Sequence, residues 1–435
     1  MNAIDRYFSI TERGSNIRTE LIAGLSTYLS LAYIFVVNPA ILHNAGIPIE
    51  AVLFATIVAS GLATLVMGLW PKLPFALAPG LEMNGFFAFT VCGTMGLSWQ
   101  SALGAVFWSG LLCILFTWIP ARGKIIDSIP AALKANIAVG VGIFVLTIGL
   151  FLAKIAIFDN GFPKGVGSLT SPPAIALYIG LIVSVVLGLP KLRFPGGMLV
   201  AIIVAAVYCK TQGITASSPA AERQDWFAAV GQLDLWQIFT EVKLLPVFLV
   251  LFLIDFYGSI GKFIGLTAST NLQTDGDVKG MKEAMYVDGI GTVGGAVLGT
   301  SSIITYVESA VGIGMGGRTG LVSVVTGVLM LCSLAFTSLV GLIPVEATAG
   351  VLVYVGWLLL PRQQWAAGTF TRFDTVAAVV MGLICLLFFN LSWAMLAGFI
   401  LYTGLHLFSP GRKNAYLIGS TVVLTLSVVA QHMMK

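Results

Sequence analysis

Charged residues are scarce in this sequence. Only 10% of its 435 residues are Asp, Glu, Lys or Arg, whereas 57% are hydrophobic and the mean hydropathy is +0.96. A soluble globular domain carries about 25% charged residues, so this chain has too few to cover a water-exposed surface of its size. The scarcity excludes an ordinary soluble protein and indicates that a lipid bilayer surrounds most of the chain.

Residues for metal and nucleophilic chemistry are also few. The sequence has 3 histidines and 5 cysteines, and the cysteines stand in apolar stretches without paired spacing, so we interpret them as packing residues. It has no Ser/His pair, metal cluster or protease-like pair of aspartates, which argues against an enzyme. It also lacks the phosphate-binding loop of an ATP-driven pump. We therefore expect no catalytic residues, no cofactor and no metal site.

The charge distribution predicts the cell compartment. The net charge of +4 does not indicate nucleic-acid binding, because the basic residues are spread between hydrophobic segments. With a cytoplasmic N-terminus, most of them fall in cytoplasmic loops, as the positive-inside rule requires. The first 18 residues are polar and mixed in charge, unlike a cleavable signal peptide. We expect a multi-pass protein of the bacterial inner (cytoplasmic) membrane.

What the sequence does contain is a long series of apolar segments. A helix needs about 20 apolar residues to cross a bilayer, and the series predicts an all-α membrane protein with fourteen transmembrane segments. A further hydrophobic stretch at 414–432 either spans the membrane or lies at its surface. The fourteen segments are 20–42, 49–70, 74–93, 99–119, 134–155, 172–190, 196–209, 244–267, 281–300, 301–316, 319–343, 345–360, 373–389 and 391–408.

The longest polar stretch divides these segments into seven and seven. An odd number in each half means that the second half enters the membrane upside down, which predicts an inverted repeat. The predicted parts are a cytoplasmic N-terminal segment (1–19), a first repeat (20–210), an extracytoplasmic linker (211–242), a second repeat (243–410) and a C-terminal hydrophobic segment (411–435).

The third segment of each half is rich in residues that break helices. In the first, Pro79 removes a backbone donor and Gly80 tolerates unusual torsions. In the second, Thr and β-branched residues at 300–307 favour a short extended stretch before a half-helix. A pair of broken segments at matching positions indicates a transport site near the middle of the membrane.

Each broken segment carries a glutamate, Glu82 in the first and Glu308 in the second. A carboxylate inside a span costs at least about 2.5–3.5 kcal/mol, so it usually faces a partner or a water-filled path. We expect the two glutamates to converge on a substrate or proton site. The alternative is that one or both of them only pair with Lys262 or cap a half-helix.

The eighth segment places Asp255, Ser259 and Lys262 on one helical face. Two positions remain open for Lys262: the cytoplasmic membrane surface, or a pocket where it meets a carboxylate or the substrate. Phe86 and Phe87 are either a stacking plate for a flat ring or core residues. Because the histidines lie outside the broken segments, a proton relay has to use carboxylates.

These residues form motifs that resemble the azaguanine-type purine permeases of the nucleobase:cation symporter-2 (xanthine/uracil permease) family. The similarity runs in order from about residue 7 to 410. It implies core and gate domains, strands in the two broken segments, and import of purine bases with protons by alternating access. The motifs are 13–20, Ala23-Gly24, Asn38-Pro39, 77–80, Asn84, 86–88, 300–302, 306–309 and 316–321.

The resemblance also implies roles for individual residues. The acidic residue that holds the base in this family matches Glu308, whereas three positions depart from the family pattern: Gly258 replaces an aspartate, Lys262 a threonine and Glu82 a glycine. We assign proton coupling to Glu82, Asp255 and Glu308. The candidate substrate-binding residues are Glu308, Glu82, Asn84, Phe86, Gly258, Lys262, Tyr306 and Thr305.

The function expected from this reading is proton-coupled import of a purine base or purine-like heterocycle. The departures at Gly258 and Lys262 keep two alternatives open: transport of an atypical or anionic heterocycle or an aromatic acid, and uncoupled facilitation. The expected partners are the small-molecule substrate, protons, the lipid bilayer and a second copy of the chain in a homodimer, with no nucleic acid.

Overall fold

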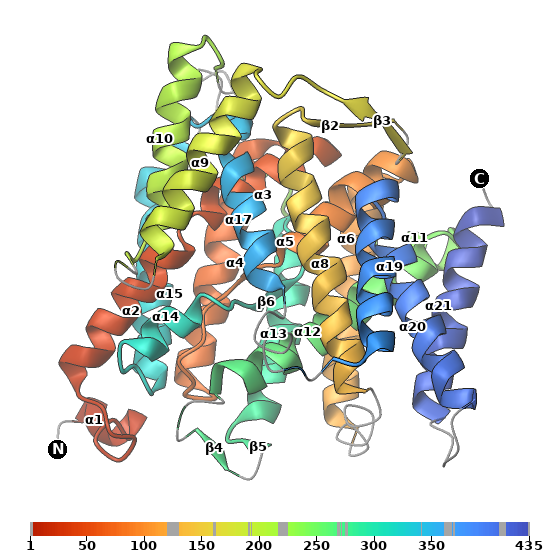
Figure 1. The fold of residues 1–435 in the computed structure, drawn as a ribbon. Helices are drawn as coiled ribbons and strands as arrows, with labels where there is room; N and C mark the ends of the chain where they lie inside the picture. Colours follow the sequence, from red (N-terminus) through yellow and green to blue (C-terminus); the bar gives the residue numbers. More distant parts are fainter. Residues whose placement is uncertain are drawn as a thin grey trace.

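Side-by-side helices make up most of the computed structural model (Figure 1). Within the part of the chain that the structure describes, six helical stretches are long and apolar enough to cross a membrane, which makes the chain a multi-pass membrane protein. The structure describes all residues except 1–2, 120–129, 160–161, 190–191, 193, 216–224, 268–269, 271, 275–276, 341, 361–367, 369, 409–414 and 434–435.

A helix lies in every predicted apolar segment, including the stretch at 414–432, while the number of membrane crossings stays a prediction. The helices up to residue 211 are α1 (Ala3–Phe8), α2 (Ile17–Leu31), α3 (Ile34–Leu42), η1 (His43–Ala45), α4 (Ile49–Leu69), α5 (Leu81–Gly85), the π-helix η2 (Phe86–Thr94), α6 (Trp99–Trp118), α8 (Ala131–Leu152), α9 (Pro172–Gly188) and α10 (Gly197–Thr211). Those that follow are α11 (Gln237–Thr240), α12 (Leu244–Thr267), α13 (Met281–Leu298), α14 (Ser309–Gly314), α15 (Gly320–Cys332), η3 (Ser333–Phe336), α16 (Thr337–Val340), η4 (Val345–Thr348), α17 (Ala349–Leu359), α19 (Arg372–Phe388), α20 (Leu391–Phe408) and α21 (Ala415–Met433).

The first predicted segment is two helices, α2 and α3, and not one continuous helix. The chain turns more tightly between them, where the Phe35 amide bonds the carbonyl of Ala32 at 3.3 Å. Pro39 lies inside α3, where its ring crowds the carbonyl of Phe35 in the first turn and where it lacks the amide hydrogen for that bond. The junction carries Tyr33, whose side chain is fully buried.

The helices form two packing groups. In the first, α15 packs against α2 and α4, and α13 packs against α4 and α6, with α12 beside α6. In the second, α17 packs against α8 and α9, α10 against α9, and α19 against α8 and α20. In Figure 1, α9, α17, α8, α19 and α20 stand beside one another as one part of the bundle.

Facing glycines bring helices within each group into backbone contact. A Cβ atom at Gly320 of α15 would lie 2.0 Å from the carbonyl oxygen of Gly68 in α4. In the second group, a Cβ at Gly356 of α17 would lie 2.5 Å from the carbonyl oxygen of Gly142 in α8. Small residues at such crossings let helix backbones approach closely in lipid, where no hydrophobic driving force holds helices together.

Two short strands connect the broken segments across the first group. Strand β1 (Leu77–Pro79) pairs antiparallel with β6 (Ile303–Thr305), and Ala78 lies opposite Ile304. The sequence did not predict the two hairpins outside the broken segments, β2 (Ala156–Asp159) with β3 (Phe162–Val166), and β4 (Gln273–Thr274) with β5 (Asp277–Val278).

The backbone contact at Gly320 predicts that a single methyl group will separate α4 from α15. We expect Gly320→Ala to lower stability by about 1–3 kcal/mol, the usual cost of overpacking, and to lower the thermal unfolding midpoint of the purified protein. The matched control is Gly294→Ala in α13, where no described atom lies within 4 Å of the added methyl group. Equal unfolding midpoints for the two variants would contradict the prediction.

Candidate functional site

Hydroxyl groups replace the helical hydrogen bonds that the first broken segment has lost. The Leu77 amide donates to Thr64 Oγ1 at 2.9 Å, and the Ala76 amide donates to Ser309 Oγ at 3.0 Å. Ser323 Oγ donates to the carbonyl of Phe75 at 2.8 Å. Irregular backbone at membrane depth persists only when its polar groups are paired or line a cavity, so these contacts fix the position of β1.

A small cavity lies where the two broken segments meet. It is about 20 Å³ in volume, which is room for roughly one water molecule. Lys262 in its wall belongs to α12 of the first helix group, whereas Val355 and Leu359 belong to α17 of the second group. The described residues that line it are Tyr33, Leu81, Glu82, Lys262, Ile304, Tyr306, Val307, Glu308, Val355 and Leu359.

Glu308 directly precedes α14 and presents one free acceptor atom. Its side chain is 6% exposed, and its Oε1 accepts a hydrogen bond from the Tyr33 hydroxyl at 2.7 Å. Its Oε2 is buried and has no hydrogen-bond partner among the described residues. A buried acceptor without a donor costs about 1–3 kcal/mol, so this oxygen is suited to an N–H group of a ligand.

Lys262 reaches into the same cavity and pairs with Glu82. The Nζ and Oε1 atoms are 3.4 Å apart, and the two side chains are 14% and 8% exposed. Of the two positions left open for Lys262, the structure has the pocket and not the membrane surface. The predicted convergence of Glu82 and Glu308 is also present, since both carboxyl groups line this cavity.

Two further predicted residues belong to β6 and the turn that follows it. The Tyr306 side chain lines the cavity and its hydroxyl donates to the carbonyl of Pro79, which ties the two broken segments together. Thr305 lies opposite Leu77 and its amide donates to Asp288 Oδ1 at 3.1 Å. Thr305 is therefore one layer behind the cavity, because β-strand neighbours face opposite sides.

Asn84 and Phe86 do not line the cavity. Asn84 is fully buried in a polar network, where its Nδ2 donates to Asn38 Oδ1 at 2.5 Å and its Oδ1 accepts from Ser301 Oγ. Phe86 and Phe87 are fully buried in the apolar core, so of the two roles left open for these rings the structure has core packing. Burial of such a ring in the core is strongly favourable, which explains their position.

Gly258 also lies outside the lining of the cavity. It is half-buried, and a Cβ atom at this position would meet no described atom within 4 Å. The missing side chain therefore leaves open space one helical turn before Lys262.

A second acidic pair combines Asp255, which the sequence analysis predicted, with Asp288, which it did not assign to the site. Asp255 of α12 accepts from Thr292 Oγ1 at 3.1 Å, and Asp288 of α13 accepts from Ser259 Oγ at 2.5 Å. Both aspartates are at least 96% buried, and their two hydrogen bonds join the same pair of helices, since Ser259 belongs to α12 and Thr292 to α13. The signal for Asp288 was an acidic residue inside a weakly apolar segment, which marks a functional position by default.

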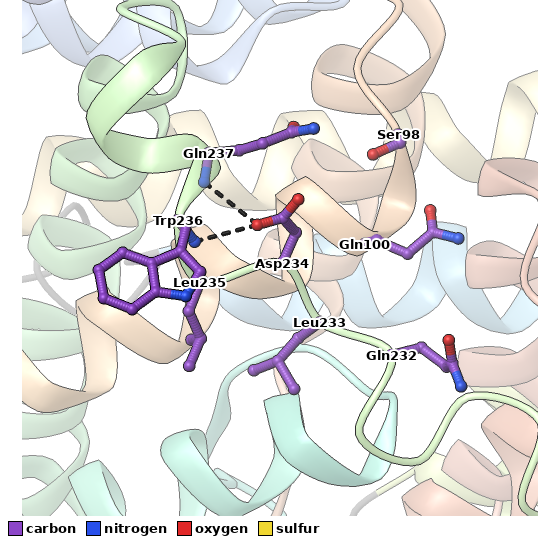
Figure 2. A pocket seen from close by; sticks show the side chains of 8 residues that line it. All are labelled: Ser98, Gln100, Gln232, Leu233, Asp234, Leu235, Trp236 and Gln237. Carbon is purple, nitrogen blue, oxygen red and sulfur yellow. Dashed lines mark hydrogen bonds between the residues drawn. The ribbon is translucent and has the colours of Figure 1, made fainter.

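A larger and open cavity of about 510 Å³ lies where the linker meets α6, and Figure 2 shows its lining residues. Its polar groups hold the linker in place. Asp234 Oδ1 accepts from the amides of Trp236 and Gln237 at 3.0 and 3.2 Å, and the Asp234 amide donates to the carbonyl of Gln100 at 2.9 Å. We interpret this cavity as the docking site of the linker and not as a ligand site.

Comparison with known proteins assigns the chain to a family. Residues 18–361 match the Permease family. A putative permease, MJ0326 of Methanocaldococcus jannaschii, is 37% identical over 96% of this chain and 95% of the relative. The adenine permease AdeQ of Escherichia coli is 34% identical over 92% of this chain and 89% of the relative. The guanine/hypoxanthine permease PbuO of Bacillus subtilis is 32% identical over 81% of this chain and 83% of the relative.

Solved structures share the fold with low sequence identity. The transmembrane domain of the cyanobacterial bicarbonate transporter BicA superposes with a TM-score of 0.66 at 16% identity, over 88% of this chain and 97% of BicA. SLC26A9 gives a TM-score of 0.66 at 11% identity, over 93% of this chain and 69% of that one. The fold is therefore the mostly helical fold of membrane transporters.

The hydrogen bond from Tyr33 to Glu308 predicts that two tyrosine-to-phenylalanine variants will differ in stability. Tyr33→Phe leaves a buried carboxylate oxygen unpaired, and we expect a loss of about 2 kcal/mol. The control is Tyr28→Phe, because the Tyr28 hydroxyl bonds the neutral hydroxyl of Ser333 at 2.8 Å. Hydrogen bonds to ionised groups are about twice as strong as neutral ones, so the thermal midpoint should fall further for Tyr33→Phe; an equal or smaller fall would contradict this.

Proposed function

The chain belongs to the Permease family, and we propose that it transports a purine base across the cytoplasmic membrane. The observation that carries the proposal is the free Oε2 atom of Glu308, a buried acceptor between two broken segments. Purines carry N–H donors in the plane of the ring, and a charge-assisted bond from such a donor to a carboxylate is short and strong. The adenine and guanine/hypoxanthine permeases related to the chain support this substrate class.

We propose that the architecture is a seven-plus-seven inverted repeat with the repeat boundaries given by the sequence, and that the N-terminus is cytoplasmic. The first packing group corresponds to a core domain and the second to a gate domain. The cavity lies between them, with Glu308 on one side and Val355 of α17 on the other. Its volume of about 20 Å³ cannot hold a purine, so binding requires the groups to separate, which is consistent with alternating access.

We propose that protons drive the transport through buried carboxyl groups. Glu82, Asp255 and Glu308 remain the candidates, and Asp288 joins them. Asp255 is the strongest, because its Oδ1 is buried without a hydrogen-bond partner among the described residues. Asp288 links this pair to the substrate site, since it accepts from the Thr305 amide in β6. Protonation of this pair would therefore act directly on β6, the strand that precedes Glu308. This connection favours coupled over uncoupled transport.

Glu308→Gln tests the proposed function. The substitution keeps the shape of the side chain but replaces one acceptor with a donor and removes the charge, so we expect binding of purine bases to weaken by roughly 100-fold or more. The measurement is ligand-induced thermal stabilisation of the purified protein by adenine, guanine and hypoxanthine. Glu346→Gln is the control, because Glu346 pairs with the exposed Lys154 away from the cavity. Unchanged stabilisation of Glu308→Gln would refute the proposal.

Asp255→Asn tests the proton coupling separately from binding. The variant should exchange purines across proteoliposome membranes at the wild-type rate but should no longer accumulate them when a proton gradient is imposed. An amide cannot take up and release the proton that the carboxyl group carries. Asp225→Asn, an exposed position in the linker, serves as the control. Proton-driven accumulation by Asp255→Asn would place the coupling group elsewhere.

A further inference from the structure

Two polar atoms in the cavity are not fully satisfied, and they have opposite character. Glu308 Oε2 is an acceptor without a donor. Lys262 Nζ carries three N–H donors, and the one partner that the structure describes for it is Glu82, at 3.4 Å. Both side chains line the same cavity, so a ligand placed there meets both an acceptor and an ammonium group.

The two hydroxyl groups of the described cavity wall already have hydrogen-bond partners. The Tyr33 hydroxyl donates to Glu308 Oε1, and the Tyr306 hydroxyl donates to the carbonyl of Pro79. The remaining wall is apolar, with Leu81, Val355 and Leu359 among its residues. Recognition of polar atoms on the ligand therefore depends on Glu308 and on Lys262 with its partner.

We infer that Lys262 is a specificity-determining residue that selects bases carrying a carbonyl oxygen beside a ring N–H. This inference rests on the proposed purine transport. Such a base places its N–H against Glu308 Oε2 and its oxygen against the ammonium group. A carbonyl oxygen has two lone pairs, so it can accept both N–H groups that Lys262 has left after bonding Glu82.

A base with an amino group in place of the oxygen fits this pair less well. In the same orientation, the amino hydrogens would face the donors of Lys262. If the base is turned over, an amino hydrogen can bond Glu308 Oε2, but the ring nitrogen then offers Lys262 one lone pair instead of two. A buried site rejects an analogue that leaves its polar groups unpaired much more strongly than it rejects a small change in shape. Hypoxanthine and adenine are the matched ligands, because they differ in having an oxygen or an amino group at the same ring carbon.

Glu82 acts in this arrangement as a positioning residue. Its carboxylate holds the ammonium group of Lys262 at 3.4 Å and balances its charge in a site where both side chains are largely buried. Removing Lys262 alone would leave Glu82 as an unpaired buried charge, which is strongly destabilising. The test therefore uses the double variant Lys262→Met/Glu82→Gln, which removes both charges together.

The experiment measures the dissociation constants of hypoxanthine and adenine for purified wild-type protein and for the double variant. We expect wild-type protein to bind hypoxanthine about tenfold or more tightly than adenine, and the double variant to bind the two bases within about threefold of each other. The control is Lys154→Met/Glu346→Gln, which removes an ion pair of the same length, 3.4 Å, whose lysine is 69% exposed. It should keep the wild-type ratio.

The outcomes separate this inference from the proposed function. A wild-type protein that binds adenine as well as hypoxanthine, or a double variant that keeps the full preference, overturns the role of Lys262 while purine transport stands. Binding of neither base by the wild-type protein overturns the proposed function and this inference with it. If the double variant fails to fold, Lys262→Arg, which keeps the charge but moves the donors, should still narrow the ratio; an unchanged ratio overturns the inference.

Discussion

Backbone groups that leave helical geometry inside a membrane need other hydrogen-bond partners, and the pairing of β1 with β6 provides them here. The pairing is supported from outside the sheet by Thr64, Ser309 and Ser323. The positions of both carboxylates in the cavity follow from this sheet, because Glu82 lies just after β1 and Glu308 just after β6, whereas Lys262 comes from α12. The two acidic groups of the site thus depend on a few backbone hydrogen bonds.

The contacts within each helix group differ in kind from the contacts between the two groups. Within each group, glycines such as Gly68 with Gly320 and Gly142 with Gly356 allow backbone contact, which has little freedom to adjust. Around the cavity the second group contributes the side chains of Val355 and Leu359. Contacts between side chains can be exchanged for others at smaller cost than backbone contacts at glycines. The movement between the groups that we propose for transport would therefore leave the glycine contacts within each group in place.

The sequence predicted the local breaks well because their causes are local. Pro79, Gly80 and the β-branched residues near Ile303 act on their own backbone, and the acidic residues beside them marked the site. The sequence could not predict that Tyr33 bonds Glu308, because the two residues are 275 positions apart and Tyr33 lies in an ordinary apolar segment. Likewise nothing near Asn84 shows that its amide is bound by Asn38 and Ser301. Such partners depend on how distant segments pack.

The antiparallel pairing of β1 with β6 also sets the order in which the protein can be completed during synthesis. Strand β1 leaves the ribosome long before β6, because the helices from α5 to α13 are made between them. Until β6 arrives, Ala76, Gly80 and their neighbours lack the partners that they have in the finished protein. Assembly of the site is therefore a late event, and a nascent chain that ends before Ile303 contains Glu82 but has no cavity in which to use it.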